Sequence, residues 1–178
     1  SSADNIDEFL ETIVEGEDGL YYLYGDQERP VETREITVRV RTPEGAMEER
    51  PCTTYRTPPG PVVRGTDDRW ISVARMEEPM RALMQSFSRT RARKLDEYLT
   101  IMEAHTNSSN INLFADSEGN VAYRHSHFVP IRDPRFDYGA PGDGSDPRTD
   151  RHGLHALEDS PPAINPETGF AVCTTNGP

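Results

Sequence analysis

The sequence predicts an α+β fold, with a mainly antiparallel sheet, two helices packed on it and a long irregular C-terminal segment. Apolar residues alternate with period two over 36–40 and 111–123, which is typical of strands with one buried face. Apolar residues between 80 and 102 instead follow helical spacing. Prolines and glycines crowd the chain after Asp133 and exclude long regular elements there.

The length of 178 residues suits a single domain, 1–178, with a modest core. Within it we expect strands over about 6–74, helices over about 79–105, a hairpin over about 110–125 and an irregular segment over 133–178. Only 34% of residues are hydrophobic while 28% are charged and 15 are proline, so loops should occupy much of the chain.

The net charge of −12 argues against binding to nucleic acid or to an anionic membrane surface, because both carry the same sign. The sequence has no run near the ~20 apolar residues of a membrane helix and no signal peptide. We therefore expect neither nucleic acid nor membrane among its partners.

The first segment, 4–13, allows two interpretations. It sets Ile6, Leu10 and Ile13 against polar positions, which fits either a short helix capped by Asp4 or Asn5 or a strand. A turn at 15–19, an aromatic strand at 20–24 and a tight turn at Gly25-Asp26 follow.

Alternation of Ile36, Val38 and Val40 with polar residues predicts a half-buried strand. Pro43-Glu44-Gly45 should turn the chain, and 48–57 should return it. Residues 70–74 form one more predicted strand.

Two helices are expected next. Glu78-Pro79 marks the start of the first, because proline is favoured at the first helical position and acidic residues favour the positive end of the helix dipole. Its apolar stripe is Met80, Leu83, Met84 and Phe87, and the second helix, 92–105, carries Leu95, Tyr98, Leu99 and Met102. A stripe that contains methionine is usually core, so we expect both helices to pack onto the sheet.

The stretch 107–133 reads as a hairpin. Ile111, Leu113 and Ala115 lead to the turn residues 117–120, and Val121, Tyr123 and His125 carry the return strand. The irregular segment beyond it still holds apolar anchors, so we expect it to lie over the sheet and to end in a short strand over 169–174.

Cysteine and histidine give little indication of a metal site. Cys52 and Cys173 lack Cys-x-x-Cys spacing, which argues against zinc and leaves open either a disulfide or two free thiols. The histidines have neither helical periodicity nor Cys or Glu companions, so we expect no metal at His125, His127, His152 and His155.

Several motifs in order resemble the penicillin amidase family. They are Phe114-Ala115-Asp116, Gly119-Asn120-Val121-Ala122-Tyr123, Pro130-Ile131-Arg132 and Asn165-Pro166-Glu167-Thr168-Gly169-Phe170. Pro30 through Val40 and Arg56 through Val63 match two earlier family segments, although Pro59 stands where the family usually has histidine. The resemblance favours a strand for 4–13.

The resemblance implies part of an αββα N-terminal-nucleophile hydrolase, an internal piece of the beta chain of an enzyme that cleaves amides of N-acylated small molecules. Penicillins and acyl-homoserine lactones are the substrate types it suggests. The nucleophile would lie outside this chain, since Ser1 lacks the family's nucleophile context. Expected partners are the remainder of the parent alpha and beta chains and an acyl amide substrate. The parent would be periplasmic or secreted, and a non-catalytic binding or structural module remains the alternative.

The resemblance also assigns two sets of site residues. The asparagine that donates to the oxyanion in the family falls on Thr175, and Asn176 lies one place later, so either the mechanism is altered or Asn176 takes the role by a one-residue slip. A structural Ca²⁺ would be held by Asp4, Ile6, Asp7 and Tyr138, unless the acidic start of the chain is merely solvated. Since both chain ends approach the oxyanion hole in the family, Asp4 and Thr174 should lie one or two strand spacings apart.

Overall fold

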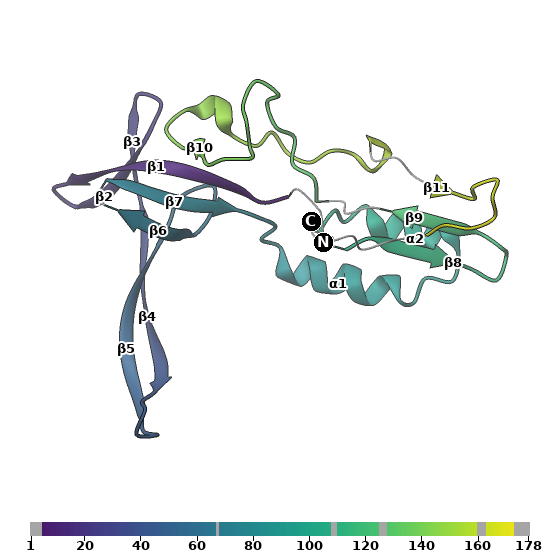
Figure 1. Cartoon of the computed structure of the whole chain (residues 1–178), viewed down its shortest axis with the longest axis horizontal. Helices are drawn as coiled ribbons and strands as arrows, with labels where there is room; N and C mark the ends of the chain where they lie inside the picture. Colours follow the sequence, from purple (N-terminus) through teal and green to yellow (C-terminus); the bar gives the residue numbers. More distant parts are fainter. Residues whose placement is uncertain (1–4, 67, 108–109, 125–127, 160–162, 173–178) are drawn as a thin grey trace. The chain divides into compact units, whose positions relative to one another are not determined.

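The computed structural model describes residues 5–66, 68–107, 110–124, 128–159 and 163–172. These residues form two compact units (Figure 1). The sheet unit comprises Ile6–Arg75 and Arg132–Asp150, and the helix unit comprises the described parts of Ser1–Asn5, Met76–Ile131 and Arg151–Pro178. Whether both units belong to one domain, as the length predicts, stays a prediction.

The main sheet of the sheet unit is antiparallel, in the order β3-β2-β1-β7-β6, and β10 adds a short parallel pairing to β1. The strand order places β1 in the centre of the sheet (Figure 1). The elements are β1 (Asp7–Gly16), β2 (Gly19–Tyr24), β3 (Gln27–Pro30), β6 (Val62–Thr66), β7 (Arg69–Ala74), β10 (Gly142–Asp143) and the 3-10 helix η1 (Pro147–Thr149). The predicted α+β class with mainly antiparallel sheets is confirmed.

The start of the chain is a strand rather than a helix. In β1 the buried positions are Asp7, Phe9, Glu11 and Ile13, and each position between them is more exposed. Period two therefore directs two carboxylates and two apolar side chains to the same inner face. Ile13 packs with Tyr22 and Val31 in the core of this unit.

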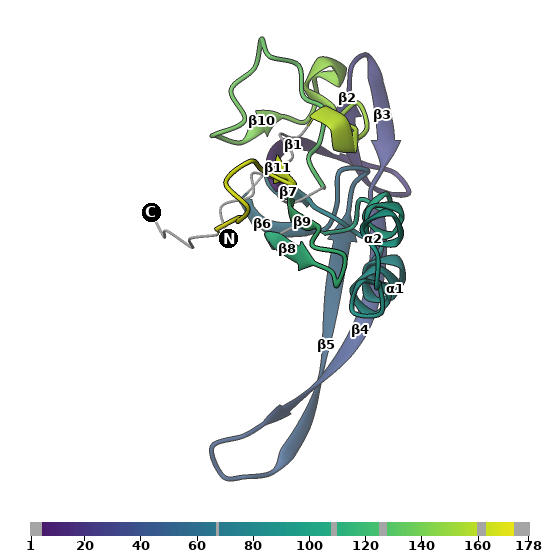
Figure 2. The ribbon, with the colours of Figure 1, turned by 90° about the vertical axis from the view of Figure 1, so that its right-hand side faces the viewer.

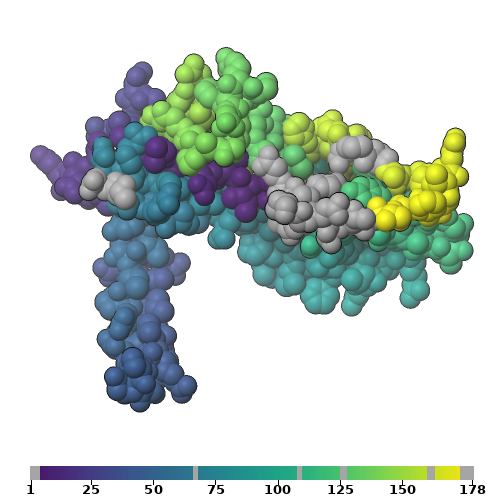
Figure 3. All heavy atoms as spheres, in the orientation of Figure 1, coloured from purple at the N-terminus to yellow at the C-terminus, as the bar shows by residue number. Residues whose placement is uncertain are grey.

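Strands β4 (Glu32–Arg41) and β5 (Met47–Arg56) pair over ten residues and form a separate two-stranded sheet, here called the arm. Figure 3 shows the arm projecting from the rest of the sheet unit. The strands and their turn were predicted correctly. The expected half-burial is wrong, because Ile36 and Val38 remain 37% and 40% exposed.

The helix unit holds α1 (Pro79–Arg89) and α2 (Leu95–Met102), with a three-stranded sheet in the order β11-β9-β8. Figure 2 looks nearly along both helices. The strands are β8 (Asn112–Ala115), β9 (Val121–Arg124) and β11 (Ala163–Ile164), and η2 (Leu157–Asp159) is a 3-10 helix. The core consists of Tyr98, Met102 and Ala122, so the stripe of the second helix packs as predicted.

Helix α1 buries its polar face and exposes the apolar face that its sequence pattern predicts to be buried. Its buried residue is Gln85, whose amide donates to the carbonyls of Ile101 and Met102 and accepts from Thr106 Oγ1 at 2.7 Å. The stripe Met80, Leu83, Met84 and Phe87 is exposed. The prediction that this stripe packs onto the sheet is therefore wrong, because hydrogen bonding of Gln85 fixes the other face of the helix inward.

In its described residues, the segment after Asp133 is irregular as predicted, with only β10, β11, η1 and η2 as short elements. The final strand predicted over 169–174 is not found in its described part, 169–172. The last strand in the described part of the chain is β11, which pairs with β9 through Ala163 and Ile164. Among the residues that the structure describes, neither helix has the length and apolar character needed to span a membrane.

Candidate functional site

Asp7 is the best-defined member of the predicted site residues. The Arg132 guanidinium lies against its carboxylate, with Nη2 2.8 Å from Oδ1 and Nε donating to Oδ2 at 3.2 Å. The side chains of Asp7 and Arg132 are 1% and 15% exposed. A nearly buried pair of this kind ties the start of β1 to the Pro-Arg loop.

Tyr138 belongs to the same cluster. Arg132 lies over its ring at 5.4 Å from the centroid, and the Tyr138 hydroxyl donates to the carbonyl of Thr149 at 3.1 Å. Burial is the main cause that raises the pKa of this phenol. The structure thus brings Asp7 and Tyr138, 131 positions apart in sequence, onto one arginine.

The other members of the calcium set are less informative. Ile6 is exposed, and Asp4 lies outside the described residues. Calcium takes six to eight oxygen ligands. Of the set's two carboxylates, the described part contains only that of Asp7, which Arg132 already binds. The described residues do not by themselves make a calcium site, and the assignment stays a prediction.

Both oxyanion candidates, Thr175 and Asn176, lie outside the described residues, as do Ser1, His125, His127 and Cys173. The predicted proximity of Asp4 and Thr174 likewise falls outside them. Of the remaining candidates, His155 lies 3.5 Å from Asp159, and Cys52 is an exposed free thiol on the arm. No cluster of three metal-ligating side chains occurs in the described part of the chain.

Glu11 is a buried carboxyl that the sequence did not single out. Its Oε1 accepts from Thr57 Oγ1 at 2.8 Å and from Ser72 Oγ at 2.7 Å, while its fully buried Oε2 has no hydrogen-bond partner. Burial raises the pKa of this carboxyl, the two hydroxyls lower it, and Asp150 and Asp143 raise it further. The available signal was its place on the inward face of β1, between Phe9 and Ile13.

The hairpin motif meets the late Asn-Pro motif. Asp116 accepts from the backbone of Glu118 and Asn120 and closes the β8–β9 turn. Asn165 Nδ2 then donates to Asn120 Oδ1 at 2.9 Å, and its own Oδ1 accepts from Val121 N at 2.8 Å. The two motifs, 45 positions apart, are therefore joined by two hydrogen bonds of the Asn165 side chain.

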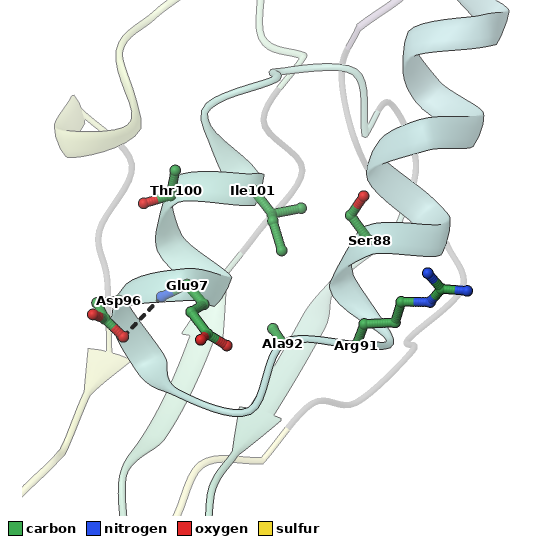
Figure 4. Close-up of a pocket in the computed structure, with 7 residues that line it drawn as sticks. All are labelled: Ser88, Arg91, Ala92, Asp96, Glu97, Thr100 and Ile101. Atoms are coloured by element: carbon green, nitrogen blue, oxygen red, sulfur yellow. Dashed lines mark hydrogen bonds between the residues drawn. The ribbon is translucent and has the colours of Figure 1, made fainter.

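A shallow hollow of about 500 Å³ lies between the two helices and is lined by Ser88, Arg91, Ala92, Asp96, Glu97, Thr100 and Ile101. Figure 4 shows Ser88 and Ile101 pointing toward one another across it, while Arg91 points away. The carboxylates of Asp96 and Glu97 cap neighbouring backbone amides. Among the described residues no base is hydrogen-bonded to Ser88.

Comparison with known families decides the relationship. The family model for penicillin amidase matches residues 1–178, which is the whole chain. The chain belongs to the penicillin amidase family. Three residues of the family motifs make the contacts described above: Arg132 binds Asp7, and Asn165 binds Asn120.

Among solved structures, the chain is similar to the thermostable penicillin G acylase from Alcaligenes faecalis, with a TM-score of 0.83 and 25% sequence identity. The match covers 98% of this chain and 31% of that chain. The chain therefore spans about a third of the length of that acylase.

Proposed function

We propose that this chain is framework from the beta chain of an N-terminal-nucleophile amidohydrolase that acts on N-acylated small molecules. The observation that carries the proposal is the family match over residues 1–178, and the fold similarity to a penicillin G acylase supports it. In this proposal the catalytic serine, threonine or cysteine is supplied by sequence outside these residues.

Amide hydrolysis by this class of enzyme requires an activated nucleophile and donors that bind the oxyanion. In this class the free amine of the N-terminal residue takes the proton from its own side chain, which attacks the amide carbonyl. Donors must then meet the oxyanion at a fixed position, and loss of one typically lowers kcat about 10²–10³-fold. In their respective units, the Asp7–Arg132 pair and the hydrogen bonds of Asn165 with Asn120 and Val121 fix the geometry.

The finer assignments belong to the same proposal. Either Thr175 or Asn176 donates to the oxyanion, and Asp4, Ile6, Asp7 and Tyr138 contribute to a structural calcium site. The substrate is an acyl amide of the penicillin or acyl-homoserine lactone type, and the enzyme works in the periplasm or outside the cell. The isolated 178 residues are inert in this proposal, because they hold no amine-activated nucleophile.

The test compares two proteins against chromogenic acyl amides: the 178-residue chain and the product of the complete reading frame that contains it. We expect turnover only from the longer product. Turnover by the 178-residue chain that Ser1→Ala abolishes would instead make Ser1 the nucleophile. No turnover by either protein would favour the non-catalytic module.

The oxyanion assignment is tested in the longer product. If Thr175 occupies the donor position, Thr175→Asn should raise kcat and Asn176→Ala should leave it unchanged. If Asn176 has slipped into the role, Asn176→Ala should lower kcat about 10²-fold or more. Unchanged kcat in both variants removes both residues from the oxyanion hole.

A further inference from the structure

Helix α1 presents an apolar face to solvent. Met80, Leu83, Met84 and Phe87 follow the spacing i, i+3, i+4, i+7 and are 70%, 48%, 64% and 63% exposed. We call these four residues the α1 stripe. Single exposed apolar residues are ordinary on protein surfaces, but four adjoining large ones along a helix mark an interaction surface.

The inward face of α1 shows that the stripe is not simply a misplaced core. Gln85 is 5% exposed and is fully engaged with Ile101, Met102 and Thr106, so this polar face is already packed. Turning the stripe inward would move Gln85 out to solvent and take it away from the buried Thr106 hydroxyl, and leaving a buried polar group unsatisfied costs about 1–3 kcal/mol. Because α1 buries Gln85 and leaves its apolar stripe exposed, we infer that the stripe contacts a second surface.

We propose that the α1 stripe is the docking face for another part of the penicillin amidase polypeptide, an apolar surface that lies outside these 178 residues. The matched acylase chain is about three times as long as the region this chain covers, since 31% of it aligns, so most of that framework has no counterpart here. The inference rests on the proposed function in taking the occupant from the same enzyme.

A second copy of this chain is the less suitable occupant. Two copies would each bring a net charge of −12, which opposes association. A stable free-standing interface also needs roughly 800 Å² on each partner. Four side chains on one helix supply only a part of that area, which suits a contact that adds to the many others within one assembled enzyme.

The chain's own methionines provide the test, because thioether oxidation by hydrogen peroxide follows exposure. Met80 and Met84 lie in the α1 stripe, and Met102 is fully buried and serves as the protected reference. Oxidation rates are measured by peptide mass spectrometry in the 178-residue chain, in the longer product and in urea-unfolded protein, which gives the fully accessible rate.

We expect Met80 and Met84 to oxidise at near the unfolded rate in the 178-residue chain and at least tenfold more slowly in the longer product. Met102 should be slow in both. Equal rates for Met80 and Met84 in the two proteins would overturn the proposal. Protection that grows with the concentration of the 178-residue chain, together with dimers in sedimentation, would assign the stripe to a second copy instead.

A variant separates this inference from the proposed function. Leu83→Glu with Met84→Glu should leave the melting temperature of the 178-residue chain unchanged and lower that of the longer product by several degrees. Arg81→Glu, at an exposed position of the same helix, is the matched control and should affect neither. If the longer product protects Met80 and Met84 yet cleaves no amide, the docking face stands and the proposed function fails. Equal effects of the double variant on both proteins would contradict the inference.

Discussion

The carboxyl of Glu11 combines full burial, two hydroxyl donors and an oxygen without a partner. Burial raises its pKa in the folded chain above the ordinary value of 4.5. The stabilisation from holding the proton is fully present below pH 4.5 and is lost as pH rises through the folded value, because the unfolded chain then releases its proton more easily.

We therefore predict that Glu11→Gln stabilises the sheet unit at neutral pH relative to the wild type, with the difference shrinking as pH falls toward 4.5. Glutamine retains an acceptor for Thr57 and Ser72 and cannot ionise. Thermal melts of both proteins from pH 4 to 8 measure the effect. Parallel pH profiles for the two proteins would show that Glu11 is not held protonated.

The Asp7–Arg132 pair leads to a second prediction at this scale. Asp7→Asn should cost about 3 kcal/mol of unfolding free energy, because it removes the Asp7 charge from beside the largely buried Arg132 guanidinium. Glu49→Gln is the matched control, since its pair with Arg39 is exposed on both sides and should be worth less than about 1 kcal/mol. Denaturant titration compares them, and equal losses would mean that burial of the pair is unimportant.

At the scale of an element, the loop between β5 and β6 depends on close backbone approach. Thr57 N donates to Gly60 O at 3.1 Å, and a Cβ added at Gly60 would lie 2.0 Å from the carbonyl oxygen of Val73. This contact is with backbone of β7, which cannot move aside as a flexible side chain could. The close contact with the Val73 carbonyl thus explains why a glycine, rather than a residue with a side chain, stands at position 60 of the Arg56–Val63 motif.

Gly60→Ala should destabilise the chain by about 1–3 kcal/mol, as overpacking does in other tightly packed sites. Gly142→Ala is the matched control in the same unit, because its added Cβ would meet Phe9 at an ordinary 3.5 Å. Urea unfolding of both variants measures the contrast. A loss at Gly142 as large as that at Gly60 would show that the contact with the Val73 carbonyl is not the cause, because Gly→Ala otherwise stabilises by reducing the entropy of the unfolded chain.

The two helices show why periodicity predicted the elements better than their packing. The stripes on α1 and α2 look alike in sequence, yet Tyr98 and Met102 are core while Met84 and Phe87 are exposed. An apolar stripe in the sequence predicts that a helix has an apolar face. It does not predict which surface covers that face. The buried Gln85 could not be recognised either, because its partners are two carbonyls and a hydroxyl 16 to 21 positions away.

At the scale of the molecule, strand alternation, the helical stripes and the proline-rich end of the chain predicted the fold class, whereas the oxyanion and calcium sets remain predictions. Strand alternation located β4 and the β8–β9 hairpin, and β5 and β7 were also predicted as strands. For the segment that contains β1, the residues left helix and strand open, and the family resemblance favoured the strand. Long-range pairs such as Asp7 with Arg132 could not be derived from local patterns, since 125 residues separate them. The strands of the arm were predicted correctly, but their burial was not, because burial likewise depends on contacts that local patterns do not show.

The net charge of −12 gives a prediction for the whole chain. Self-repulsion opposes the compact state, so the melting temperature should rise by a few degrees between 10 and about 200 mM NaCl, where the Debye length falls below ~10 Å. Neutralising exposed Glu17, Asp18 and Glu103 with their amides should shrink that rise. A melting temperature independent of salt in both proteins would show that the acidic surface does not limit stability.

The arm of β4 and β5 has two open edges, since each strand pairs only with the other in the described structure. Such edges are templates for pairing between molecules and can lead to aggregates. The arm carries its own protection in Arg39, Glu49, Arg50 and Pro51, as charges and a proline discourage strand addition. Replacing these residues with threonine or valine should therefore open the edges of the arm to strand addition between molecules.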